Sequence, residues 1–306
     1  MSSAGPTIIG GVQVDVVMLP VAQLPAPGQT QLVEQMSFRS GGAAANAALA
    51  LASSGRPARL IGCVAEDDLG RWLIEDLSRS GLGEGIIVLD GHTTGLTVAC
   101  EAPGRDRSFI TFLGVNTVWA LEHMPADVAS CASLLVCDYF CAPSLRGAPT
   151  RELMLRARAQ GARTFFDTAW DPSGWARETR EEVLGLLDVV DVFLPNEAEA
   201  SALLGLDAPA EQLARQLQHI SGGWVVVKMG ARGARAAGPD GAQLSVAAQP
   251  VEVLDSTGAG DAFNAGLIAA LCDGADWPEA LESGTRLAAS VLSRRRREGV
   301  AAQRSA

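Results

Sequence analysis

The chain has 306 residues, enough for one elaborated α/β domain or two small domains with a sizeable core. Hydrophobic residues make up 48% and charged residues 19%, a composition that excludes an intrinsically disordered protein. The formal net charge of -11 argues against nonspecific nucleic-acid binding, but it leaves anionic substrates open because binding sites are local.

Short β-branched runs alternate with segments of helical periodicity through most of the chain. The expected strands are residues 7–9, 59–64, 133–137, 163–166, 189–194 and 224–228. The expected helices are residues 43–53, 69–80, 151–160, 180–187, 210–220 and 262–271. This alternation predicts an α/β protein whose mainly parallel sheet is covered by helices on both faces, with the loops after the strands along one edge.

Two stretches, about 12–38 and 93–113, break this pattern because their residues alternate in the manner of antiparallel strands. The second stretch is expected to turn at residues 103–106. Together they predict a small antiparallel sheet laid over the site and inserted into a single domain that spans residues 1–306.

The sequence also favours a particular compartment. No apolar run approaches the roughly 20 residues needed to span a bilayer, and no N-terminal segment resembles a secretory signal. The six cysteines include no Cys-x-x-Cys pair, which predicts small buried side chains rather than a metal site. We expect a cytoplasmic protein with no membrane or nucleic-acid partner.

A glycine-containing turn lies between an apolar strand-like run, residues 251–254, and the last predicted helix. Its sequence is Asp255-Ser256-Thr257-Gly258-Ala259-Gly260-Asp261. Gly258 and Gly260 let backbone N–H groups converge on one point, where the helix dipole favours an anion such as a terminal phosphate. Asp261, in the first helical turn, is placed to accept a proton from an attacking hydroxyl. The pattern indicates phosphoryl transfer; the alternative is an ordinary capped strand-to-helix turn.

The whole string resembles the second signature of the ribokinase-like (PfkB) carbohydrate kinase family, Asp-Thr-x-Gly-Ala-Gly-Asp, with Ser256 where Thr is common. A second string, Gly41-Gly42-Ala43-Ala44-Ala45-Asn46, resembles that family's first signature, Gly-Gly-x-x-x-Asn. The resemblance implies a ribokinase-like three-layer sandwich with a mainly parallel central sheet. It also implies a small β lid that closes over a sugar and often forms a dimer contact, and hence a homodimer through the lid.

The resemblance assigns roles to individual residues. Asp261 would be the general base, and the turn of Gly258, Ala259 and Gly260 would stabilise the transferring phosphoryl group. The acceptor-binding positions would be Asp15, Gly41, Gly42 and Asn46. Asp255 and Thr257 match positions that the family links to a monovalent cation such as K⁺.

Two further strings carry the expected nucleotide site. Asn196-Glu197-Ala198-Glu199 resembles the family's Asn-x-x-Glu motif, which implies nucleotide binding at Asn196 and Mg²⁺ near Glu199 through water. The same spacing is also a capping pattern with Asn196 as N-cap, and both interpretations can hold together. The string from Lys228 to Gly233 resembles a nucleotide-binding Thr-x-Gly-x-x-Gly segment. The positions it contributes are Lys228, which replaces the usual hydroxyl residue, Gly230 and Gly233.

These residues predict a Mg²⁺-dependent kinase that transfers phosphate from ATP to a hydroxyl of a sugar or related small polyol. A nucleoside kinase of the same superfamily and a non-catalytic sugar-binding regulator are the alternatives. A nicotinamide enzyme has little support, because no Gly-x-Gly-x-x-Gly follows the first strand. The segment Asp167-Thr168-Ala169-Trp170-Asp171 lacks the Asn and Arg of the Asp-x-Asn-x-Arg segment in several sugar-kinase branches. That departure argues against the fructokinase and ketodeoxygluconate kinase branches.

Overall fold

The structure is a computed structural model, and it describes the backbone of residues 5–100, 108–252 and 257–303. Nine strands of this described part form the larger of two sheets. In spatial order they are β13 (Gln243–Val246), β12 (Ala234–Ala237), β11 (Trp224–Lys228), β10 (Val192–Phe193), β9 (Arg163–Phe166), β8 (Ser133–Val136), β1 (Thr7–Ile9), β4 (Arg59–Ala65) and β5 (Ile86–Leu89).

The large sheet is mainly parallel, as predicted. Neighbouring strands from β11 to β5 pair in parallel, and β12 and β13 add an antiparallel edge. Ile8 and Phe165 enter one buried core, whereas Ile9 and Phe166 enter the other. Successive side chains of a strand point to opposite faces, so this split means that both faces of the sheet are buried.

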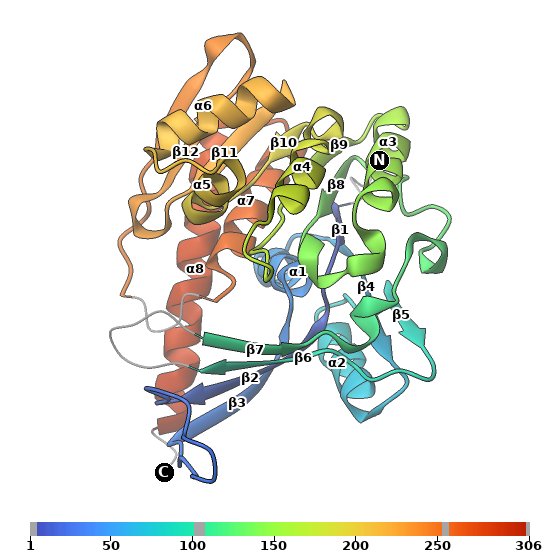
Figure 1. The fold of residues 1–306 in the computed structure, drawn as a ribbon, viewed down its shortest axis with the longest axis vertical. Coiled ribbons are helices and arrows are strands. Elements are labelled where there is room, and N and C mark those ends of the chain that lie inside the picture. The colour runs from blue at the N-terminus through green and yellow to red at the C-terminus, as the bar shows by residue number, and fades with distance from the viewer. Residues whose placement is uncertain (1–4, 101–107, 253–256, 304–306) are drawn as a thin grey trace.

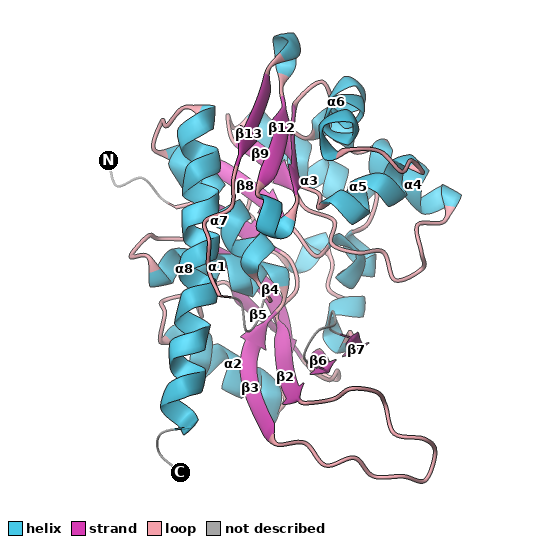
Figure 2. Cartoon of the chain, turned by 90° about the vertical axis from the view of Figure 1, so that its left-hand side faces the viewer, coloured by secondary structure: helices cyan, strands magenta, loops and turns pink. Residues whose placement is uncertain are grey.

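Helices cover both faces of the sheet. One layer contains α1 (Ala43–Ser53), α2 (Asp68–Ser78), α7 (Ala259–Cys272) and α8 (Trp277–Gln303). The other contains α3 (Ala148–Ala159), α4 (Arg177–Leu184), α5 (Glu197–Leu204) and α6 (Ala210–Ser221). Figure 2 shows α1, α7 and α8 on one side of the sheet and α3 to α6 on the other. The three layers confirm the expected sandwich.

A four-stranded sheet projects from one end of this body (Figure 1). Its strands are β3 (Gln35–Gly41), β2 (Gln13–Leu19), β6 (Leu96–Cys100) and β7 (Ser108–Phe112). The pairs β2–β3 and β6–β7 are antiparallel as expected, but β2 and β6 pair in parallel, so the sheet is mixed. β2 and β6 follow β1 and β5 in the chain, two strands of the large sheet that run in the same direction. The predicted turn at 103–106 lies outside the described residues.

Other boundaries differ from the prediction for local reasons. The expected strand at 189–194 shortens to β10, because Leu187–Val189 forms a 3-10 helix and the carboxylate of Asp191 accepts a hydrogen bond from the N–H of Thr164. Val251 and Glu252 lie in no strand, and the rest of that expected run lies outside the described residues. None of the helices in the described part is both apolar enough and long enough for a membrane span.

Candidate active site

The glycine turn before α7 meets the first turn of α1. Gly258 is the N-cap of α7 with a φ of 75°, a left-handed conformation that favours glycine. Asn46 Nδ2 donates a hydrogen bond of 2.9 Å to Asp261 Oδ2. Asp261 is half-buried and Gly260 is exposed, so the turn lies at the protein surface. The fold thus brings the predicted base into contact with a predicted acceptor-binding residue.

The glycines of the first signature are required by close approaches within the chain. A Cβ atom on Gly41 would lie 2.1 to 2.3 Å from the carboxyl atoms of Asp15. A Cβ atom on Gly42 would lie 2.1 Å from the carbonyl oxygen of Gly11, and Gly42 has a φ of 92°. The family resemblance assigned both glycines to acceptor binding. The structure shows that the absence of side chains here also lets Asp15 and the loop after β1 reach the start of α1.

Asp138, two residues after the end of β8, is a candidate site residue that the sequence reasoning missed. Its Oδ2 accepts a hydrogen bond of 2.5 Å from the N–H of Ala43, the first residue of α1. Its backbone has a φ of 53°, and left-handed conformations of non-glycine residues cluster at functional sites. The available signal was a carboxylate immediately after a predicted parallel strand, at the sheet edge where such sites form.

The site concentrates negative charge around Asp138. Burial raises the pKa of Asp138 to about 8, and the charges of Asp261, Asp167 and Asp15 act in the same direction. The hydrogen bond from Ala43 opposes this rise. The Asp138 carboxyl is therefore mainly protonated at neutral pH.

The Asn196 and Glu199 pair forms a reciprocal cap at the start of α5. Asn196 Oδ1 accepts from the N–H of Glu199, and Glu199 Oε2 accepts from the N–H of Asn196, both at 2.8 Å. The capping interpretation is confirmed. Burial raises the pKa of Glu199 to about 7, with a further increase from the charge of Asp167 and an opposing effect of Lys228. Because metal ligands must be deprotonated, a cation that arrived beside this carboxyl would displace its proton.

Lys228 ends β11 and lies beside this cap. Its Nζ donates a hydrogen bond of 2.5 Å to Asp167 Oδ2. Gly230 begins a short 3-10 helix and Gly233 follows its end, and their φ values are 57° and 88°. A Cβ atom on Gly233 would lie 1.9 Å from the carbonyl oxygen of Val246, so this glycine lets β13 approach. In the sequence, Asp167 stood out only as part of the segment that differs from the family's Asp-x-Asn-x-Arg pattern. Its position directly after β9 was the signal for a place in the candidate site.

Residues 7–298 match the family described as pfkB family carbohydrate kinase. The chain belongs to this family. Fructokinase-1 of Oryza sativa subsp. japonica is 28% identical over 254 residues, covering 80% of this chain and 78% of that protein. Ribokinase of Haemophilus influenzae is 25% identical over 297 residues, covering 94% and 92%. The crystal structure of a putative ribokinase II from E. coli, in complex with ATP and Mg²⁺, has a TM-score of 0.79 and 24% identity, covering 95% and 93%.

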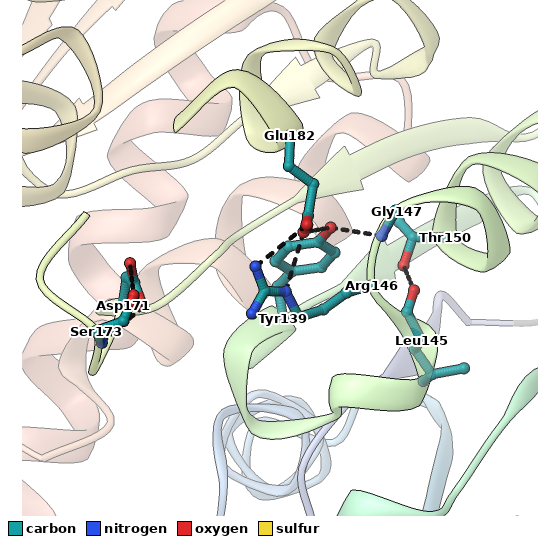
Figure 3. Close-up of polar contacts among 8 residues, drawn as sticks. All are labelled: Tyr139, Leu145, Arg146, Gly147, Thr150, Asp171, Ser173 and Glu182. Carbon is teal, nitrogen blue, oxygen red and sulfur yellow. Dashed lines mark hydrogen bonds and ion pairs between the residues drawn. The ribbon is translucent and has the colours of Figure 1, made fainter. Parts of the chain in front are cut away.

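The loop that carries Asp138 in this carbohydrate kinase is held by a polar cluster (Figure 3). Tyr139 Oη donates to Glu182 Oε1 at 2.5 Å and accepts from the N–H of Gly147 at 2.6 Å. Arg146 donates two hydrogen bonds to the Glu182 carboxylate, from Nε at 2.9 Å and from Nη2 at 3.2 Å. Because Tyr139 directly follows Asp138 in the chain, these contacts restrict the motion of the loop and so the position of the Asp138 carboxyl group.

The raised carboxyl pKa values predict that the kinase becomes less stable as the pH rises from about 5 to 7. Over this range the folded state keeps protons on Asp138 and Glu199 that the unfolded state releases, so the free energy of unfolding falls with pH. We expect the free energy of unfolding, measured by urea denaturation, to fall by about 2 kcal/mol per pH unit. Asp138→Asn should reduce that slope by about half. A free energy of unfolding that stays constant or rises over this range would contradict the assigned protonation states.

Two predicted cation ligands of the kinase remain, Asp255 and Thr257. Asp255 is outside the described residues, and Thr257 is half-buried directly before Gly258. Within the described part of the chain, no cluster of three or more His, Cys, Asp or Glu side chains is arranged to hold a metal ion.

Proposed function

We propose that this kinase transfers the γ-phosphoryl group of ATP to a hydroxyl of a sugar or related small polyol at the glycine turn before α7. The hydrogen bond between Asn46 and Asp261 is the observation that carries this proposal. It joins a residue of the acceptor signature to the acid–base group of the phosphoryl-transfer signature. A sugar hydroxyl bound by Asn46 would therefore lie within reach of the carboxylate that must deprotonate it.

Asp261 accepts the proton of the attacking hydroxyl. The Asn46 amide donates a hydrogen bond to this carboxylate and fixes its orientation. Backbone N–H groups of Gly258, Ala259 and Gly260, at the positive end of α7, stabilise the charge on the transferring phosphoryl group. Because the transition state of phosphoryl transfer is loose, positioning and charge stabilisation supply most of the catalysis.

The acceptor lies between the start of α1 and the lid. Asp15, Gly41, Gly42 and Asn46 contact its hydroxyl groups. Asp138 joins them, because a protonated carboxyl can both donate and accept hydrogen bonds. The lid strands, inserted at about 12–38 and 93–113 in a single domain spanning residues 1–306, cover the acceptor and limit access of water.

The nucleotide phosphates lie along Asn196, Lys228, Gly230 and Gly233. The Glu199 carboxyl fits Mg²⁺, a hard cation that prefers oxygen donors and binds mainly through phosphates and water. Bound Mg²⁺ would neutralise charge on the phosphates. Asp255 and Thr257 would hold K⁺ beside the glycine turn. All six cysteines are free thiols, which suits the cytoplasm as the location of the enzyme.

The test is a panel of sugars, sugar acids, polyols and nucleosides assayed for acceptor-stimulated ADP release with Mg²⁺ and ATP. We expect stimulation by a sugar or polyol. Stimulation by nucleosides alone would identify the enzyme as a nucleoside kinase. Binding of a sugar with no ADP release would indicate a regulator, and either result would overturn the proposal.

The lid also carries a surface for a second copy of the chain. Met36, Phe38, Ile110 and Phe112 are 55%, 50%, 53% and 56% exposed. The strand registers place them on the face of the lid sheet opposite to Asp15. An apolar sheet face of this kind packs favourably against an identical face related by two-fold symmetry.

We expect the kinase to be a dimer at micromolar concentration, measured by sedimentation velocity. The double variant Phe38→Glu with Ile110→Glu should be monomeric, because it places buried like charges at the proposed contact. Leu155→Glu is the matched control, since Leu155 is 47% exposed on α3, away from the lid. A monomeric wild-type protein, or a dimer that survives the double substitution, would contradict dimerisation through the lid.

A further inference from the structure

Lys228 and Asp167 form an ion pair that is almost completely removed from solvent. Their side chains are 13% and 6% exposed, and the Nζ–Oδ2 distance is 2.5 Å. Removing two charges from water costs free energy that their mutual attraction often fails to recover, so such pairs are poor devices for stability alone. The position of the pair gives it a different use.

The ammonium group lies beside the first turn of α7. A Cβ atom on Gly260 would be 3.7 Å from Lys228 Nζ, which puts the cation next to the residue that precedes Asp261. Gly260 itself is exposed, so an anion approaching the N–H groups of the turn also approaches this ammonium group. In the described part of the chain, one of its three N–H donors is used, in the bond to Asp167.

The charge on Lys228 is secured by its surroundings. Burial lowers the pKa of Lys228, but the negative charges of Asp167, Glu199 and Asp261 outweigh that effect and leave it above its usual value. The side chain therefore remains an ammonium ion at neutral pH. It can neutralise negative charge but cannot act as a base.

Asp167 is itself fixed by contacts to the catalytic helix. Its Oδ2 accepts a second hydrogen bond of 2.5 Å from Asn264 Nδ2, and its Oδ1 accepts one of 3.1 Å from the N–H of Ala169. Asn264 is fully buried on α7, three residues after Asp261, and the two residues lie on one side of the helix. The position of the Lys228 ammonium group is thus tied to the helix that carries the proposed base.

The geometry points to Lys228 as a catalytic residue that stabilises the transferring phosphoryl group, with Asp167 and Asn264 as positioning residues. This inference rests on the proposed kinase function. In the step, a bond forms between the acceptor oxygen and the γ-phosphorus, and the bond from that phosphorus to the β–γ bridging oxygen breaks. The electron pair stays on ADP and the hydroxyl proton goes to Asp261. Lys228 keeps its protons and offsets the charge that develops on the phosphoryl oxygens.

The test compares the affinity of each enzyme for ADP with its affinity for ADP plus aluminium fluoride, a mimic of the transferring phosphoryl group, in the presence of Mg²⁺. We expect the wild-type enzyme to bind ADP more tightly when aluminium fluoride is present. The Lys228→Met enzyme should lose this increase in affinity, while its affinity for ADP alone stays within about threefold of the wild-type value. Turnover of Lys228→Met should fall by about a hundredfold or more, as for loss of a preorganised transition-state donor. Asp167→Asn should lose part of the gain and about tenfold in turnover, because the ammonium group is no longer held in place.

Arg151→Met is the control. Arg151 lies on α3 and forms an exposed ion pair with Asp188, so the substitution removes a cation outside the proposed site. It should leave the fluoride effect and turnover unchanged. A Lys228→Met enzyme that keeps the fluoride effect, or a wild-type enzyme without one, would overturn the role of Lys228. Because this readout needs no acceptor, it decides the inference even if every compound of the acceptor panel fails and the proposed function falls.

Discussion

We expect the Asp261→Asn enzyme to fold normally, bind ATP and acceptor, and turn over at least about a hundredfold more slowly than the wild type. Asn has the shape of Asp and can still accept the hydrogen bond from Asn46, so the contact between α1 and α7 survives. Its amide cannot take the proton of the attacking hydroxyl. The measurement is kcat, together with thermal unfolding and calorimetric affinities for both substrates.

Asp273→Asn is the matched control for that experiment. Asp273 lies at the opposite end of α7 and pairs with Arg56 at the surface. The same substitution there should leave kcat unchanged. Near-normal turnover of Asp261→Asn would reject Asp261 as the general base, whereas equal losses in the two variants would indicate damage to the helix.

The second large effect is expected from Gly41→Ala. The added Cβ atom would lie 2.1 Å from the Asp15 carboxyl carbon, so the carboxylate must move away from the start of α1. Loss of one hydrogen bond to a charged group costs about 1.5–3 kcal/mol, which raises the KM for the acceptor about tenfold to a hundredfold. The atoms that the new Cβ atom would approach belong to a side chain and not to the backbone, so the fold should tolerate the change.

Steady-state kinetics with each substrate varied in turn provide the measurement for Gly41→Ala. The KM for ATP should stay within about twofold, because the nucleotide positions lie on other elements. An unchanged acceptor KM would show that Asp15 is not an acceptor ligand. A rise in both KM values would place the effect on the whole site.

Elements with strong local patterns were predictable from the sequence. The bounds of β1, β9, β11 and α1 follow from apolar runs or an Ala-rich segment between clear breaks. The short strands β5, β12 and β13 escaped prediction because their hydrogen bonds come from long-range pairing, which leaves a weak local signal. The parallel pairing of β2 with β6 is also a product of the tertiary fold.

The contact between Asn46 and Asp261 in the candidate site joins two residues that contiguous motifs had singled out. Asp138 and Asp167 stand alone after their strands, and only the sheet brings their carboxyl groups to the same edge. The contact of Lys228 with Asp167 joins residues 61 positions apart. Spacing along the chain carries no information about such a pair.

A crystal structure with ADP, Mg²⁺, aluminium fluoride and the best acceptor of the panel tests the central claim most directly. We predict that the fluoride mimic lies against the N–H groups of the Gly258 to Gly260 turn. A carboxylate oxygen of Asp261 should lie about 2.6–3.2 Å from the acceptor oxygen that faces the mimic. A mimic bound away from this turn, or an Asp261 side chain directed away from the acceptor, would contradict the assignment.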